Sequence, residues 1–160
     1  YTKDLLDVNL RIEMLEAMCK EHNNLNVNTI ELTLPIPSYT SDTLKAINEI
    51  DEENEYSIIM GYDVFKSIDK WKNYEDILKY PIILLPRETN DNYEDFLFYK
   101  KELERKLNNA IFVSYLQEMV VLPISSTEVR KQLATNGNVS KLLNPQVLKI
   151  IQEKKLYKND

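Results

Sequence analysis

The 160-residue sequence contains one cysteine, one histidine and two glycines. A single cysteine excludes a disulfide framework and a zinc site built from cysteines, and it suits a reducing compartment such as the cytoplasm. Two glycines exclude a collagen-like repeat and a glycine-rich linker. No apolar run approaches the roughly 20 residues of a membrane-spanning helix, since the longest are short runs such as residues 82–85 and 119–122. We therefore expect a cytoplasmic protein that does not associate with membranes.

Positive charge is also in deficit, because 20 Lys and Arg face 26 Asp and Glu, for a net charge of −6. This balance argues against a general nucleic-acid binder, whose affinity depends on a basic face that neutralises phosphates. A small anionic ligand stays compatible with it, because such a ligand needs only a local cationic site. The chain is 43% hydrophobic and 29% charged, which predicts one domain over residues 1–160 with a core of its own.

Hydrophobic periodicity predicts alternating helices and strands. The expected helices cover residues 10–19, a segment from 41 to 47, 64–68, 74–78, 93–107, 126–133, 139–143 and 145–154. The expected strands cover residues 27–32, 56–60, 81–85, 110–113 and 119–122, and the acidic run 51–55 is expected to be a solvated connection. This alternation is typical of a three-layer α/β domain with a mainly parallel sheet, in which ligands bind beyond the C-terminal ends of the strands.

The segment at residues 123–130 follows an apolar strand and opens a helix. A structural interpretation is a capping box, in which Ser125 accepts a free backbone N–H and Glu128 reaches back. A functional interpretation is a phosphate site. Arg130 lies three residues after Thr127, on the same helical face, whereas Glu128 lies about 200° away from Arg130. Hydroxyls, free N–H groups and a guanidinium then converge on one point, which suits a phosphate.

A second candidate site begins at Gly61, where the expected strand ends and Asp63 follows two residues later. One interpretation makes Gly61 a simple turn and Asp63 a helix cap, the other makes them a binding site, and the residues favour the two equally. The only tryptophan, Trp71, is either a core residue or a platform for a ring. The hydroxyl-rich residues 37–43 either cap the next helix or contribute to binding.

Taken together, these segments resemble one family, the nicotinate/nicotinamide mononucleotide adenylyltransferases of the nucleotidyltransferase superfamily. The resemblance covers nearly the whole chain, and its order and spacing are more specific than any single motif. It rests on Arg-x-x-Met-Leu at 11–15, Ser-Tyr-Thr-x-Asp-Thr-Leu at 38–44, Met-Gly-Tyr-Asp at 60–63, Trp71, Arg87, Ile-Ser-Ser-Thr-x-x-Arg at 124–130 and the closing residues 151–157.

The resemblance implies a Rossmann-like nucleotidyltransferase fold and the condensation of ATP with nicotinate or nicotinamide mononucleotide, yielding the NAD-type dinucleotide and pyrophosphate. It implies ATP contacts from Gly61, Asp63, Ser125, Ser126, Thr127 and Arg130, among which Ser126 and Arg130 would be catalytic. It implies mononucleotide contacts from Tyr39, Thr40, Trp71 and Arg87, with Trp71 stacked on the pyridine ring. The resemblance also implies Mg²⁺ bound with the ATP, although no carboxylate cluster in the sequence is typical of a dedicated metal cage.

Two departures from the family are visible. The family begins with a strand, a Gly-rich loop and a His-x-Gly-His motif, whereas the one histidine here, His22, is expected to be a solvated residue at a helix end. We therefore expect that the N-terminal strand and helix of the fold are missing from this chain and that residues 1–160 alone are inactive. Lys72 stands where bacterial members often carry an aromatic residue, which leaves the choice between nicotinate and nicotinamide open.

Two alternatives to this function remain. One is another nucleotidyltransferase of the superfamily, acting on phosphopantetheine or on a cytidylyl acceptor, against which Trp71 and the Tyr39-Thr40 pair weigh. The other is a non-catalytic nucleotide-binding fragment, which the missing His-x-Gly-His segment favours. Homo-oligomerisation is left open by the sequence.

Overall fold

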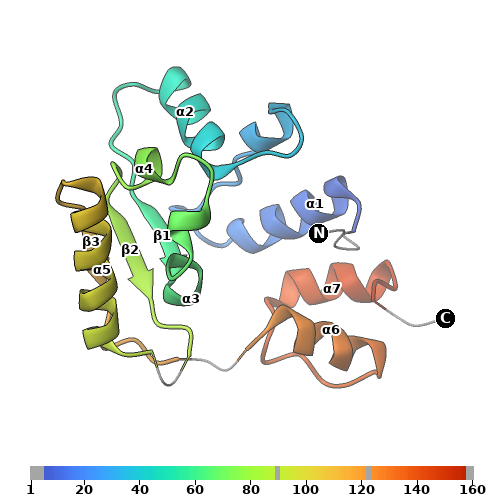
Figure 1. The fold of residues 1–160 in the computed structure, drawn as a ribbon. Helices are drawn as coiled ribbons and strands as arrows, with labels where there is room; N and C mark the ends of the chain where they lie inside the picture. Colours follow the sequence, from blue (N-terminus) through green and yellow to red (C-terminus); the bar gives the residue numbers. More distant parts are fainter. Residues whose placement is uncertain (1–5, 89–90, 122–123, 158–160) are drawn as a thin grey trace. The chain divides into compact units, whose positions relative to one another are not determined.

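The computed structural model describes residues 6–88, 91–121 and 124–157 (Figure 1). The chain forms two compact units, one of Tyr1–Asn28 with Ile124–Asp160 and one of Thr29–Pro123. The expectation of one domain over residues 1–160 stays a prediction. No helix in the described ranges is both long enough and apolar enough to cross a membrane.

A parallel three-stranded sheet forms the centre of the unit Thr29–Pro123. Its strands are β1 (Ile58–Gly61), β2 (Ile82–Leu85) and β3 (Val113–Tyr115), adjacent in that order (Figure 1). The register aligns Ile58 with Ile82 and Ile82 with Val113. Short apolar strands of this kind are typical of parallel sheets. The α/β architecture with a parallel sheet, predicted from the alternation of elements, is therefore confirmed.

Helices surround this sheet within the same unit. They are η1 (Ile30–Thr33), α2 (Thr40–Ile50), α3 (Tyr62–Phe65), η2 (Ile68–Lys70), α4 (Tyr74–Ile77) and α5 (Tyr93–Leu107), where η denotes a 3₁₀-helix. The longest, α5, begins where the Asn92 side chain accepts the N–H of Glu94 at 2.8 Å, and it ends at Asn108 with φ of 50°. Both signals follow the usual chemistry of helix ends. The predicted bounds of this helix are confirmed.

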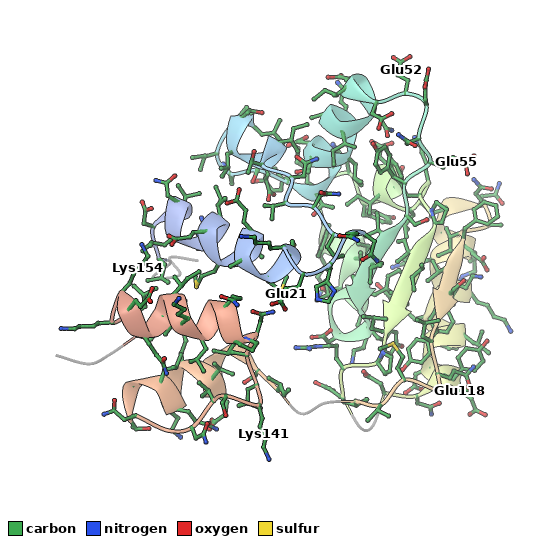
Figure 2. The ribbon with its side chains drawn as sticks, turned by 180° about the vertical axis from the view of Figure 1, so that it is seen from behind. Glu21, Glu52, Glu55, Glu118, Lys141 and Lys154 are labelled. Carbon is green, nitrogen blue, oxygen red and sulfur yellow. The ribbon has the colours of Figure 1, made fainter. Side chains whose placement is uncertain are left out.

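The core of this unit lies on one face of the sheet. Side chains alternate along a strand, so Ile82 and Leu84 of β2 point to the same face, and both are fully enclosed. Aromatic rings extend this core, because Phe96 of α5 stacks on Tyr115 of β3 with ring centroids 5.3 Å apart. The acidic connection at residues 51–55 stays outside the core, and Figure 2 shows the exposed side chains of Glu52 and Glu55.

The other unit is helical and contains α1 (Val8–Cys19), α6 (Ser126–Ala134) and α7 (Pro145–Glu153). Helix α1 packs against α7, and Lys154 forms an ion pair with Glu13 at 3.2 Å. Asn144 is the N-cap of helix α7, and its side chain accepts the N–H of Gln146 at 2.8 Å. The first residue of the helix is Pro145. Proline suits this position because its missing N–H would be unpaired there in any case.

Several predicted elements differ in the structure, among them the helix predicted at 64–68, where α3 ends at Phe65 and a turn follows. The segment 27–32 is not a strand: Ile30–Thr33 forms the 3₁₀-helix η1, whose backbone bonds stay local, as from Leu32 N–H to the Thr29 carbonyl at 2.9 Å. Residues 139–143 form a turn rather than a helix, because the Asn138 side chain accepts the Ser140 N–H at 3.0 Å.

A further difference concerns the two strands predicted at 110–113 and 119–122. The structure has β3 at Val113–Tyr115, shifted toward the C-terminus. Residues 119–121 are not in a strand, and Leu122 lies outside the described residues. A turn at residues 117–118 follows β3, so the next apolar residues do not extend the sheet. The predicted strand at 119–121 is therefore wrong.

Candidate functional site

Gly61, Asp63 and Arg87 come together at the C-terminal ends of β1 and β2. Gly61 pairs with Leu85 in the sheet, and Arg87 follows two residues later. A Cβ on residue 61 would lie 2.6 Å from the Arg87 Cγ and would also collide with an Asp63 carboxylate oxygen. The φ of Gly61 is −71°, which any residue adopts. Any larger residue here would therefore displace the side chains of Asp63 and Arg87, which both cross the backbone of Gly61.

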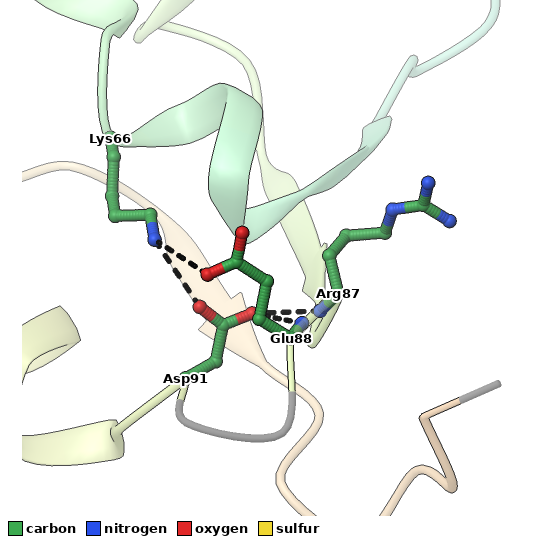
Figure 3. Close-up of polar contacts among 4 residues, drawn as sticks. All are labelled: Lys66, Arg87, Glu88 and Asp91. Carbon is green, nitrogen blue, oxygen red and sulfur yellow. Dashed lines mark hydrogen bonds and ion pairs between the residues drawn. The ribbon is translucent and has the colours of Figure 1, made fainter. Parts of the chain in front are cut away.

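The backbone after β2 is held by a buried carboxylate, that of Asp91 (Figure 3). One oxygen of Asp91 accepts the N–H of Arg87 at 2.7 Å and the N–H of Glu88 at 2.9 Å. The other oxygen lies 3.3 Å from the ammonium of Lys66, which also lies 3.9 Å from Glu88. The Asp91 side chain is only 1% exposed. Figure 3 shows the Arg87 guanidinium pointing away from this cluster.

The Asp91 carboxyl stays ionised despite its burial. Burial opposes the charged form, but the N–H groups of Arg87 and Glu88 and the ammonium of Lys66 outweigh it, so the pKa of Asp91 is lowered from its ordinary value. Neither Asp91 nor Lys66 was predicted as a site residue. An aspartate shortly after a strand-ending proline is a local turn signal that could have found Asp91.

Tyr39, Thr40 and Trp71 line a cavity of about 330 Å³. The remaining lining residues are Ser38, Lys70, Lys72 and Ile77. Trp71 is half-buried: it packs against the core and also borders this cavity. The core contacts of Trp71 agree with the interpretation as a core residue, and its place in the cavity lining agrees with the interpretation as a platform for a ring.

Lys72 connects the loop of Trp71 to the start of helix α2. Its ammonium lies 4.5 Å from the centroid of the Tyr39 ring and 2.9 Å from an oxygen of Asp42. Tyr39 is the N-cap residue of α2, and its side chain makes no capping bond. Three features of this cavity therefore suit an anionic aromatic group: the Trp71 indole, the Lys70 ammonium, and the positive end of helix α2.

Ser125, Ser126, Thr127 and Arg130 lie in the other compact unit, at the start of α6. The Ser125 hydroxyl accepts the N–H of Glu128 at 3.2 Å, as predicted for a helix cap. The Glu128 carboxylate accepts from Gln132 at 3.2 Å. The four candidate residues are exposed, while Val129 between them is buried.

The structure thus arranges the predicted site residues in three groups. Gly61, Asp63 and Arg87 gather at the strand ends, Tyr39, Thr40 and Trp71 share a cavity, and the four others share the first turns of α6. Within the unit Thr29–Pro123, polar groups beyond the C-terminal ends of parallel strands stand where open α/β sheets bind their ligands.

Comparison with known proteins defines the family. The model of the Cytidylyltransferase-like family matches residues 1–132. A protein of Caldicellulosiruptor bescii named "Probable nicotinate-nucleotide adenylyltransferase" is 33% identical over 98% of this chain and 76% of its own length. A protein of the same name from Christiangramia forsetii is 34% identical over 96% of this chain and 74% of its own.

Solved structures agree in fold. The Plasmodium falciparum nicotinic acid mononucleotide adenylyltransferase complexed with NaAD matches with a TM-score of 0.72 at 19% identity, over 97% of this chain and 76% of that one. The same enzyme complexed with APC gives the same TM-score over 97% and 78%. The chain therefore belongs to the Cytidylyltransferase-like family and, within it, to the nicotinate-nucleotide adenylyltransferases.

Proposed function

We propose that this protein transfers the adenylyl group of ATP to nicotinate mononucleotide. A phosphate oxygen of the mononucleotide attacks the α-phosphorus of ATP, the bond to the β-phosphate breaks, and the products are the dinucleotide and pyrophosphate. Membership in the nicotinate-nucleotide adenylyltransferases supports this reaction. It would serve NAD biosynthesis in the cytoplasm, a setting that suits a chain with one cysteine.

The cavity at Trp71 carries the choice of the pyridine nucleotide. Its lining contains Lys70 and Lys72; Lys72 is paired with Asp42 at 2.9 Å, so Lys70 is the lysine that favours a ring with a negative charge over a neutral amide. Stacking on Trp71 would hold the ring, and a charge-assisted contact would hold its carboxylate. Nicotinate mononucleotide is therefore the proposed acceptor rather than its amide.

The other groups are proposed to hold the phosphates and a ribose. Arg87 would contact an anionic group of the mononucleotide, and Gly61 and Asp63 would approach a ribose. Ser125, Ser126, Thr127 and Arg130 would bind the ATP phosphates, with Ser126 and Arg130 closest to the reaction. Free N–H groups at the start of α6 add to this site. Catalysis would consist of positioning and charge neutralisation, as is general for transfers to phosphorus.

Mg²⁺ is proposed to enter with ATP. Among residues 6–88, 91–121 and 124–157, no group of three or more His, Cys, Asp and Glu side chains is placed to hold a metal ion. We assign the ion no protein ligands and derive no step from it.

Two measurements test the proposal. Dinucleotide and pyrophosphate formation is measured with ATP and Mg²⁺, with nicotinate mononucleotide, nicotinamide mononucleotide or phosphopantetheine as the acceptor, and cytidylyl transfer from CTP is measured in parallel. We expect the highest kcat/KM with nicotinate mononucleotide; faster turnover of another pair would refute the assignment. Because Trp71 is the only tryptophan, its fluorescence is expected to change when nicotinate mononucleotide is added, whether or not turnover occurs.

A further inference from the structure

We propose that Asp91 is a positioning residue that fixes Arg87 for binding of the mononucleotide. This inference rests on the proposed function, in which Arg87 contacts an anionic group of the acceptor. The Asp91 carboxylate accepts the backbone N–H groups of Arg87 and Glu88, at 2.7 and 2.9 Å. These two bonds fix the direction in which the chain leaves β2, and with it the origin of the Arg87 side chain.

Arg87 has the features of a group presented to a ligand. Its methylenes cross the backbone of Gly61, where a Cβ would leave no room. It is exposed, and no hydrogen bond or ion pair of its guanidinium is found within the part of the chain that the structure describes. A guanidinium without an anionic partner next to a strand end is suited to bind a carboxylate or phosphate in a bidentate manner.

Asp91 itself cannot contact a ligand, because its side chain is 1% exposed. Asp91 can therefore affect binding only through the groups that it contacts, which are the Arg87 and Glu88 backbone and the Lys66 ammonium. Lys66 lies 3.3 Å from the second carboxylate oxygen and balances the buried charge. Lys66 also lies over the ring of Tyr62, at 5.2 Å from the centroid, so the ammonium is itself held in place. A carboxylate with both oxygens occupied is a rigid support for the Arg87 backbone.

A double-mutant cycle tests this inference. Arg87→Ala is expected to raise the KM for nicotinate mononucleotide about 10-fold or more, as the loss of a charge-assisted contact does. Asp91→Ala is expected to raise the same KM about 10-fold with little change in the KM for ATP. The double variant should be no worse than Arg87→Ala, because Asp91 acts only through Arg87. Asp91→Asn, which keeps an acceptor oxygen, should lie between Asp91→Ala and the unmodified protein.

Asp76→Ala is the matched control, since Asp76 is an exposed aspartate paired with Lys79 at 2.6 Å outside these groups. It should leave both KM values unchanged. If Asp91→Ala does not fold, the cycle is run with Asp91→Asn, and amide exchange at Arg87 and Glu88 should be faster in that variant.

Three outcomes of these measurements would refute the positioning role of Asp91. Additive effects in the cycle, or an unchanged KM in a folded Asp91 variant, would refute the positioning role while leaving the proposed function intact. Equal rises in the KM for ATP and for the mononucleotide would assign Asp91 a general structural role instead. Absence of dinucleotide formation by the unmodified protein would refute the proposed function and this inference with it.

Discussion

Replacing Gly61 by alanine should separate stability from binding. Gly61 has φ of −71° and ψ of 147°, so alanine fits the backbone without strain. Its new methyl group would instead meet two side chains, the Asp63 carboxylate and the Arg87 Cγ, the latter 2.6 Å away. Carbon atoms in contact normally lie about 3.5–4.0 Å apart. Both side chains must therefore move away from the strand ends.

The expected change in the free energy of unfolding is small. Moving a side chain off its preferred rotamer costs roughly 0.5–1.5 kcal/mol. Alanine in place of glycine restricts the unfolded chain and stabilises the protein by about 0.4–1 kcal/mol where the backbone permits it. The two effects nearly cancel, because Arg87 is exposed and free to turn outward.

Binding should change much more. If Asp63 and Arg87 both contact substrate, displacing either one loses a charge-assisted bond of roughly 1.5–3 kcal/mol. The assay is thermal unfolding together with the KM for each substrate. We expect Gly61→Ala to unfold near the temperature of the unmodified protein, with a KM raised at least 10-fold for one substrate.

Gly137→Ala is the control, since Gly137 is the only other glycine and lies among Gln132 atoms rather than site residues. It should leave both KM values unchanged. A Gly61→Ala variant with unchanged KM values, or one that unfolds well below the unmodified protein, would refute the reasoning.

Three further predictions concern separate parts of the chain. Arg130→Ala should raise the KM for ATP about 10-fold or more at unchanged stability, because Arg130 is exposed while the adjacent Val129 is buried; kinetic data showing normal ATP use would contradict this. Trp71→Phe should raise the KM for the mononucleotide several-fold through loss of stacking worth about 1 kcal/mol, and equal effects on both substrates would favour a core role. Burial, and then the charge of Asp69, raise the pKa of Tyr99 from 10.0 to about 12, so the folded state keeps its proton longer and stability should fall between pH 10 and pH 12. Unfolding curves of Tyr99→Phe should show a smaller loss, since the raised pKa values of Tyr62 and Tyr115 remain, and an unchanged pH profile would contradict the assignment.

The strands and long helices were predictable because their signals are local. The apolar runs before Gly61 and Pro86 gave β1 and β2, and the spacing of Phe96 and Leu103 gave α5. The segment around Ile30 was not predictable in this way. Its apolar residues favour a strand, but Ile30–Thr33 lies outside the sheet of β1, β2 and β3, and local bonds close a 3₁₀-turn instead.

The site shows the same division between local and tertiary information. Gly61 and Arg87 lie far apart in sequence, and motif order alone could place them at one sheet edge, since parallel strands end together. That Arg87 crosses Gly61 depends on the register of β1 and β2, which pairs Gly61 with Leu85. The aspartate at residue 91 is a local turn signal, but its burial and its contact with Lys66 depend on tertiary packing, which the sequence does not show.

The net charge of −6 is compatible with two anionic substrates for an electrostatic reason. At physiological ionic strength charges separated by more than about 8 Å are largely screened, so the acidic surface as a whole acts weakly on a bound nucleotide. The groups that would act strongly are those proposed to lie within contact distance: Arg87 at the strand ends, Lys70 and Lys72 at the cavity, and Arg130 on α6. The acidic run at residues 51–55 lies in an exposed connection where its charges are solvated. Composition thus argues against a long polyanion, which needs an extended basic face, and is compatible with the proposed binding of small anions by a few placed cations.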